Sequence, residues 1–224
     1  MTGRRGPVED LKWTDKLQAS VSTPAPMPRI HGYDVRGEML GISSFAETMF
    51  LSLTGELPSP DTLMAFEAVL VFLAPVSVAE AAGHASLLAG LCGSGSGGLT
   101  GVSAIALAER SRNMVNEYLP LAEAALGGKD LPASEGAEET RLLLKALREA
   151  EVSYPGKLEQ LPPPAACMAV LMECCGIRNR RIMETVITLA GLPCTLAEGM
   201  AAKPGNFRTY PIGLPEYEYD DRRT

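Results

Sequence analysis

Apolar side chains recur every three or four residues over most of the chain, which predicts a succession of helices. The expected helices cover residues 43–55, 61–74, 78–92, 100–121, 138–151, 165–177 and 180–192. Ser43 or Ser44 can cap the first of them and Gly55 can end it. Pro60 suits the first turn of the second, which is apolar on almost every side and therefore expected to be buried.

Two stretches interrupt this pattern. Residues 1–28 hold turn formers and three prolines close together, and they are expected to form an extended lead-in. Residues 127–137 form the clearest polar break, which could be a hinge or a trimmed insertion. No tandem repeat is visible.

Three glycines match the G-x-G-x-x-G pattern of dinucleotide-binding proteins: Gly93, Gly95 and Gly98. That pattern binds a phosphate only where a β-strand precedes it. The preceding residues, 84–92, have the composition of a helix. We therefore expect a flexible loop between helices.

The composition also favours helix over sheet. Ala, Leu and Met are plentiful while aromatic residues make up only 5%, and unbranched side chains lose little rotamer freedom in a helix. A length of 224 residues with 46% hydrophobic residues suffices for one sizeable core or two small ones.

The charge pattern bears on partners and location. A net charge of −7 without a dense Lys or Arg run disfavours nucleic acid and anionic membranes as partners. Residues 1–13 lack the apolar core of a secretory signal, and the most apolar stretch, residues 68–79, is too short to span a bilayer. We expect a soluble, cytoplasmic protein that binds a small organic molecule or another protein.

Five cysteines are scattered through apolar segments: Cys92, Cys167, Cys174, Cys175 and Cys194. The odd number and the absence of a second pair or a histidine at metal spacing argue against a disulfide framework and a metal site. We expect buried free thiols, with the adjacent Cys174 and Cys175 on different sides of a helix.

Two segments resemble the citrate synthase and citryl-CoA lyase superfamily. Within residues 29–59, GYDVRG followed by SSFAETMFLSLTGELPS resembles its first segment. Residues 161–199, which contain LPPPAACMAVLMECCGIRNRRIMETVITLAGLPCTLAEG, resemble its late helix, glycine turn and second helix. The last piece, NFRTYPIGLPEYEYD, is similar to the Arg- and Tyr-bearing ends of these enzymes. The resemblance implies an all-α fold and chemistry that joins or splits an acyl-CoA and a keto acid.

That chemistry uses an aspartate and two histidines, whose pKa values can be tuned near neutrality. Carried over position by position, the aspartate's place falls at Ala165. The place of one histidine falls near residues 110–114, RSRNM. The G-x-G-H stretch that supplies the other has no counterpart before residues 138–151.

Two further family histidines are also missing. The place of one falls near Ala81, and the place of the A-H-x-x-E histidine falls at Thr195. The whole chain contains two histidines, His31 and His84, and neither lies where the chemistry needs one. Losing one member of a cooperating catalytic set removes several orders of magnitude of rate, so the usual mechanism is not expected.

The resemblance leaves cationic residues as candidates for binding. Arg208 resembles the arginine that clamps a substrate carboxylate, and Arg222 or Arg223 could match the one that reaches into the neighbouring subunit's site. Arginines near a charged C-terminus are, alternatively, solvated. Lys157 and Lys203 could touch a coenzyme A phosphate, with charge as the only support.

Four residues could replace the missing catalytic groups: His84, Glu109, Ser111 and Glu198. Glu109 beside arginines on one helix also suits a salt-bridged, solvated face. His84 among small residues also suits a buried, hydrogen-bonded position.

We therefore predict an all-α, citrate synthase-like fold with a reduced or remodelled small domain. Residues 29–109 and 166–224 would form the large helical domain, and residues 110–165 the reduced one. Neither a metal nor a tightly bound cofactor is expected. The apolar helices predict a homodimer or a heteromer with a citrate synthase-like paralogue.

Two functions stay open. The first is a non-catalytic member of the superfamily that binds at most a small carboxylic acid or a coenzyme A thioester. The second is an active enzyme of carbon–carbon bond chemistry between an acyl-CoA and a keto acid, with a rearranged site. The missing residues favour the first.

Overall fold

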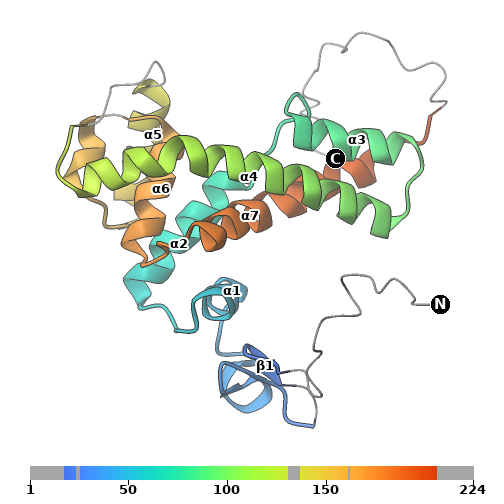
Figure 1. Cartoon of the computed structure of the whole chain (residues 1–224), viewed down its shortest axis with the longest axis horizontal. Helices are drawn as coiled ribbons and strands as arrows, with labels where there is room; N and C mark the ends of the chain where they lie inside the picture. Colours follow the sequence, from blue (N-terminus) through green and yellow to red (C-terminus); the bar gives the residue numbers. More distant parts are fainter. Residues whose placement is uncertain (1–17, 24–25, 131–136, 161, 206–224) are drawn as a thin grey trace, which may run out of the picture. The chain divides into compact units, whose positions relative to one another are not determined.

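The computed structural model divides the chain into two units, Met1–Leu57 and Pro58–Thr224 (Figure 1). It describes residues 18–23, 26–130, 137–160 and 162–205. Helices dominate both units, so the all-α prediction is confirmed.

The first unit contains a small antiparallel sheet that the sequence pattern did not predict. Its strands are β1 (Ser22–Thr23), β2 (Arg29–Ile30) and β3 (Tyr33–Asp34), and they pair in chain order. His31 and Gly32 connect β2 to β3 with φ angles of 46° and 92°. Two positive φ values are what a tight two-residue hairpin requires.

Two helical segments follow the sheet, the π-helical turn η1 (Val35–Met39) and α1 (Phe45–Thr54). Ser44 and Glu47 form a reciprocal capping box at the start of α1, with N···O distances of 3.1 and 2.6 Å. Gly55 ends the helix with a φ of 86°. The predicted cap and stop of this helix are both confirmed.

The second unit is built from six α-helices and a 3-10 turn within its described residues. They are α2 (Pro60–Leu73), α3 (Ala81–Leu91), α4 (Ser96–Leu126), α5 (Ala137–Glu149), η2 (Gly156–Gln160), α6 (Pro164–Cys174) and α7 (Arg180–Ala201). α4 begins at Ser96 rather than near Thr100, because Gly97 and Gly98 continue the helix. Gly95 caps α4, and Gly93 has a φ of 72° in the turn before it. No described helix is long and apolar enough to cross a membrane.

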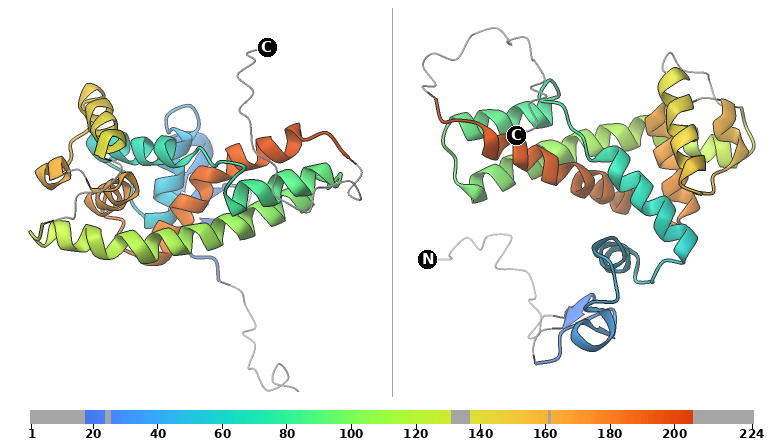
Figure 2. Two further views of the ribbon diagram at one scale, coloured as in Figure 1. Left: turned by 90° about the horizontal axis from the view of Figure 1, so that it is seen from above. Right: turned by 180° about the vertical axis from the view of Figure 1, so that it is seen from behind.

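The long helix α4 organises this unit (Figures 1 and 2). α3 and α7 pack along its N-terminal half, α6 packs against its C-terminal half, and α5 lies on α6. α2 contacts both α6 and α7. The buried face of α4 repeats every four residues at Leu99, Ser103, Leu107, Ser111 and Val115.

The predicted domain division stays a prediction. α4 continues without interruption through residue 110, where the reduced domain was expected to begin. Gly127 caps the C-terminus of α4 at the start of the polar break, and residues 131–136 of that break lie outside the described residues.

Candidate functional site

A hollow of about 580 Å³ lies beside the middle of α4, and we call it the polar hollow. The first turn of α3 and the start of α6 supply its other walls. Its lining residues are Glu80, Ala81, Ala82, Ala106, Glu109, Arg110, Asn113, Met114, Glu117, Tyr118 and Ala165. On α4 these residues recur at helical spacing, so one side of the helix forms a wall.

The polar hollow is lined by residues from three segments that the sequence resemblance singled out. By that resemblance, Ala81, the range 110–114 and Ala165 correspond to places of acid–base residues. The structure brings Ala81, Arg110, Met114 and Ala165 together in one lining. Three segments far apart in the chain therefore meet at one hollow.

An ion pair joins α3 to α4 at the edge of this hollow. Arg110 donates from Nε to Oε2 of Glu80 over 2.6 Å. The other oxygen of Glu80 accepts a 3.2 Å hydrogen bond from the backbone N–H of Ser77, which fixes the carboxylate. Nη1 of Arg110 is buried and has no hydrogen-bond partner among the described residues. The guanidinium therefore keeps donor capacity for a further acceptor.

The remaining charges of the polar hollow are acidic. Glu109 is paired with Arg112 one turn along the same helix. Glu117 lies beside Tyr118, and burial together with a hydrogen bond to Glu117 raises the pKa of the Tyr118 hydroxyl. Carboxylates thus outnumber cations in the lining.

A second hollow of about 540 Å³ shares part of the same wall of α4. Arg110, Met114 and Tyr118 line both hollows, since they stand four residues apart on one face of the helix. The rest of the second hollow comes from residues 71–73, Pro75, Glu139 and residues 163–165.

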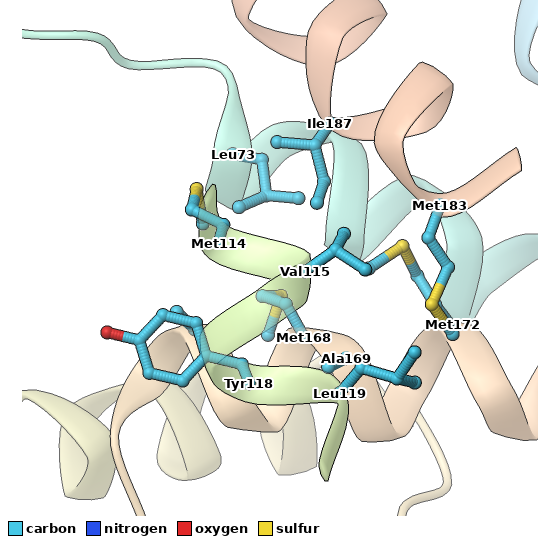
Figure 3. A pocket seen from close by; sticks show the side chains of 11 residues that line it. Leu73, Met114, Val115, Tyr118, Leu119, Met168, Ala169, Met172, Met183 and Ile187 are labelled. Carbon is cyan, nitrogen blue, oxygen red and sulfur yellow. The ribbon is translucent and has the colours of Figure 1, made fainter. Parts of the chain in front are cut away.

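Beneath both hollows the core is apolar and rich in methionine (Figure 3). Met168, Met172 and Met183 enclose a gap of only about 10 Å³. The ring of Tyr118 lies at one end of this layer, and its hydroxyl points away from Met168, Met172 and Met183 (Figure 3). The gap is too small for a ligand.

Thr195, which the resemblance puts at the place of the A-H-x-x-E histidine, has a different environment. Thr195 is fully buried on α7 and donates its hydroxyl to the carbonyl of Gly191 over 2.8 Å. Ser86 of α3 donates to the Thr195 carbonyl over 2.7 Å and accepts from Ser103 of α4 over 3.0 Å. We call this contact the seam of α3, α4 and α7.

The four candidate replacements for the catalytic groups are dispersed. Glu109 alone among them lines the polar hollow. Ser111 is buried and hydrogen-bonded to the Leu107 carbonyl and the Thr188 hydroxyl. His84 is half-buried on α3, and Glu198 is exposed on α7.

The cationic candidates are not brought together among the described residues. Lys157 forms a 3.0 Å ion pair with Asp130. This contact lowers the pKa of the Asp130 carboxyl. Lys203 is exposed after α7. Arg208, Arg222 and Arg223 lie outside the described residues.

All five cysteines are free thiols, as predicted, but two rather than five are buried. Burial raises the pKa of the Cys167 and Cys175 thiols to about 12. Cys174 is exposed while Cys175 is buried, which confirms the prediction that they point to different sides. The described residues contain no cluster of three potential metal ligands.

Sequence reasoning missed the pairing of Arg110 with Glu80. Arg110 was considered only as part of a charged helix face. Its position at the family's histidine stretch was the available signal, but thirty residues separate it from Glu80 and only the fold joins them.

No family model and no curated protein matches the chain. Its structure is similar to that of a citryl-CoA lyase from Hydrogenobacter thermophilus, with a TM-score of 0.63 and 17% sequence identity. The likeness covers 91% of this chain and 97% of that one. Identity that low establishes the fold alone: the chain has a citrate synthase/citryl-CoA lyase-like fold.

Proposed function

We propose that the chain is a non-catalytic protein of this fold that binds a small carboxylic acid, or an acid joined to coenzyme A, in the polar hollow. One observation carries the proposal. By the sequence resemblance the hollow lies at places of the superfamily's acid–base residues, yet no histidine and no aspartate of the described residues lines it. Its ionisable side chains are Glu80, Glu109, Arg110, Glu117 and Tyr118.

The superfamily's reaction needs a base at the methyl carbon beside a thioester carbonyl and donors that stabilise the enolate oxygen. A neutral imidazole can donate a hydrogen bond without carrying charge, and a carboxylate cannot. Ala81, Met114 and Ala165 have no proton to give. The hollow keeps its space, while alanine and methionine stand at those places.

Binding is supported by Arg110. A guanidinium presents donors in a planar fork that matches a carboxylate, and Nη1 has no partner among the described residues. Arg208, Arg222 or Arg223 would add a second clamp on the acid. Lys157 or Lys203 would contact a coenzyme A phosphate, and Lys157 would first have to leave Asp130.

A partner chain, either a second copy or a citrate synthase-like paralogue, is also part of this proposal. Ile105 is 76% exposed and Val102 is 40% exposed on α4. With the small residues Gly98 and Gly101 they form an apolar stripe on the outer face of α4, suited to contact with another helix. Ile105→Glu should shift the mass measured by light scattering toward the monomer, while Thr100→Glu, an exposed neighbour, should not.

The activity assay tests the proposal. The purified chain would be given acetyl-CoA with oxaloacetate, and separately citryl-CoA, and free coenzyme A would be measured. We expect no release above the uncatalysed rate. Turnover that is lost in Arg110→Met or Arg208→Ala would contradict the non-catalytic assignment.

The alternative is an enzyme with a rearranged site, and a specific feature favours it. Glu109 and Glu117 place carboxylates in the hollow, and a carboxylate can serve as a base for carbon acids. Under this alternative, Glu117→Gln would abolish turnover and leave thermal stability unchanged. Glu198 and Ser111 would be dispensable, since neither lines the hollow.

A further inference from the structure

We propose that the polar hollow selects a small molecule with a carboxylate at one end and an ammonium group at the other, of the ω-amino acid class. This inference rests on the proposed binding function and names its ligand. It follows from the charges on the walls, which do not match a citrate-like polyanion.

The lining has an excess of negative charge. Glu80, Glu109 and Glu117 face a single lining cation, Arg110. Arg110 is already neutralised by Glu80 at 2.6 Å, and Glu109 is neutralised by Arg112. The partner that the structure gives Glu117 is the Tyr118 hydroxyl, which carries no positive charge. A tricarboxylate would meet like charge here, whereas an ammonium group would meet an opposite one.

The carboxylate of the ligand would bind Arg110, the cation in the lining of the polar hollow. The Arg110 side chain is 21% exposed, so part of it borders the hollow. Its Nη1 is buried and lacks an acceptor among the described residues, which costs folding free energy, and a turn of the guanidinium toward the hollow would bring this donor to a ligand oxygen. A ligand oxygen beside Arg110 lets the guanidinium reorient and gives Nη1 an acceptor, which removes that cost.

The spacing of the two charged positions sets the length of the ligand. Arg110 and Glu117 are seven residues apart on one helix, about 10 Å along its axis. Asn113 and Met114 stand between them in the same lining. A ligand with one carbon between its charges cannot touch both ends. A chain of several methylenes can, and its apolar middle would lie against Met114.

Isothermal titration calorimetry with 6-aminohexanoate, glycine and citrate tests this inference. We expect 6-aminohexanoate to bind at least about tenfold more tightly than glycine or citrate. Glu117→Gln should weaken 6-aminohexanoate about tenfold because it removes a charged contact. The control Glu67→Gln, at an exposed position on α2 outside both hollows, should leave the dissociation constant unchanged.

Arg110→Lys keeps the positive charge. This variant should bind 6-aminohexanoate more weakly, and its melting temperature should stay close to that of the natural chain. Tighter binding of citrate, indifference to Glu117→Gln, or no binding of 6-aminohexanoate at millimolar concentration would overturn the ligand assignment. Citrate binding that depends on Arg110 would overturn this inference and leave the proposed carboxylate-binding function standing. Release of coenzyme A in the activity assay would instead overturn the proposed function.

Discussion

Two regions along α4 differ in packing at places that the sequence resemblance assigns to histidines. The seam of α3, α4 and α7 holds Thr195 in a fully buried, hydrogen-bonded contact. The polar hollow holds Ala81 and Arg110 beside about 580 Å³ of open space. One place has been filled by packing and the other has been left open.

Glycine explains why the seam is closed. A Cβ on Gly90 of α3 would lie 2.0 Å from the carbonyl oxygen of Gly199 on α7. A Cβ on Gly199 would lie 2.5 Å from Oγ of Ser86. The helix backbones are therefore nearly in contact, which leaves no room for an imidazole near Thr195. The small residues Ala81 and Ala165 have the opposite effect in the polar hollow. No neighbouring backbone fills the space beside them, so the hollow stays open.

The largest expected effect comes from restoring a histidine in each region. Thr195→His should destabilise the protein by about 4 kcal/mol, since it overpacks the seam and buries a polar ring. Ala81→His should cost less than about 1 kcal/mol, close to the helix-propensity difference, because residue 81 is exposed beside the hollow. Urea unfolding of both variants measures the difference. Equal costs would contradict the distinction between a closed and an open region.

Gly90→Ala should destabilise by about 3 kcal/mol, because α3 and α7 would have to separate. The matched control is Gly101→Ala, also within a helix but with no atom within 4 Å of its new Cβ. This variant should gain about 0.5–1 kcal/mol from the higher helix propensity of alanine. Melting temperatures that move in opposite directions would support the close approach, and a tolerated Gly90→Ala would refute it.

Alkaline pH tests whether the core around α6 is as dry as the seam. Burial raises the pKa of the Cys167 and Cys175 thiols to about 12. Above pH 9 the unfolded chain loses protons that the folded chain keeps, so the free energy of unfolding falls. The expected slope is about 1.4 kcal/mol per pH unit for each thiol, until the pH approaches 12.

Urea titrations in reductant between pH 8 and pH 10.5 would measure this slope. Cys167→Ala should lower it by one thiol's share, and Cys92→Ala, at an exposed position, should not change it. A slope that Cys167→Ala leaves unaltered would indicate that water reaches this thiol.

The smallest effect is expected at the ion pair that borders the hollow. Glu80→Gln should cost about 1 kcal/mol, because the pair with Arg110 is partly exposed and solvent weakens it. Thermal unfolding would measure the cost, with Glu67→Gln, at an exposed position on α2, as the control. A loss above about 3 kcal/mol would mean that this edge is packed as tightly as the seam.

Local chemistry made part of the fold predictable from the sequence. Ser44 and Gly55 bound α1 as expected because a cap and a left-handed stop depend on nearby residues. The hairpin at His31 and Gly32 was missed because its strands have only two residues each, too short for an alternating pattern. α4 starts before Thr100 because packing against α3 and α7 outweighs the weak helix propensity of two glycines.

The site was predictable only in outline. The resemblance implied places without their acid–base residues, and three of the residues there, Ala81, Arg110 and Ala165, lie in one lining. The acidic excess and the link from Arg110 to Glu80 could not be read from the sequence. They depend on which helices pack side by side, and no local pattern encodes that.

Hydrogen exchange at the methyl group of acetyl-CoA tests the central claim most directly, because removal of that proton is the first step of the superfamily's chemistry. The chain at high concentration would be incubated with acetyl-CoA in D₂O and followed by NMR. The account predicts exchange no faster than in buffer alone. Faster exchange that disappears in Glu117→Gln or Arg110→Met would contradict it and place a working base in the polar hollow.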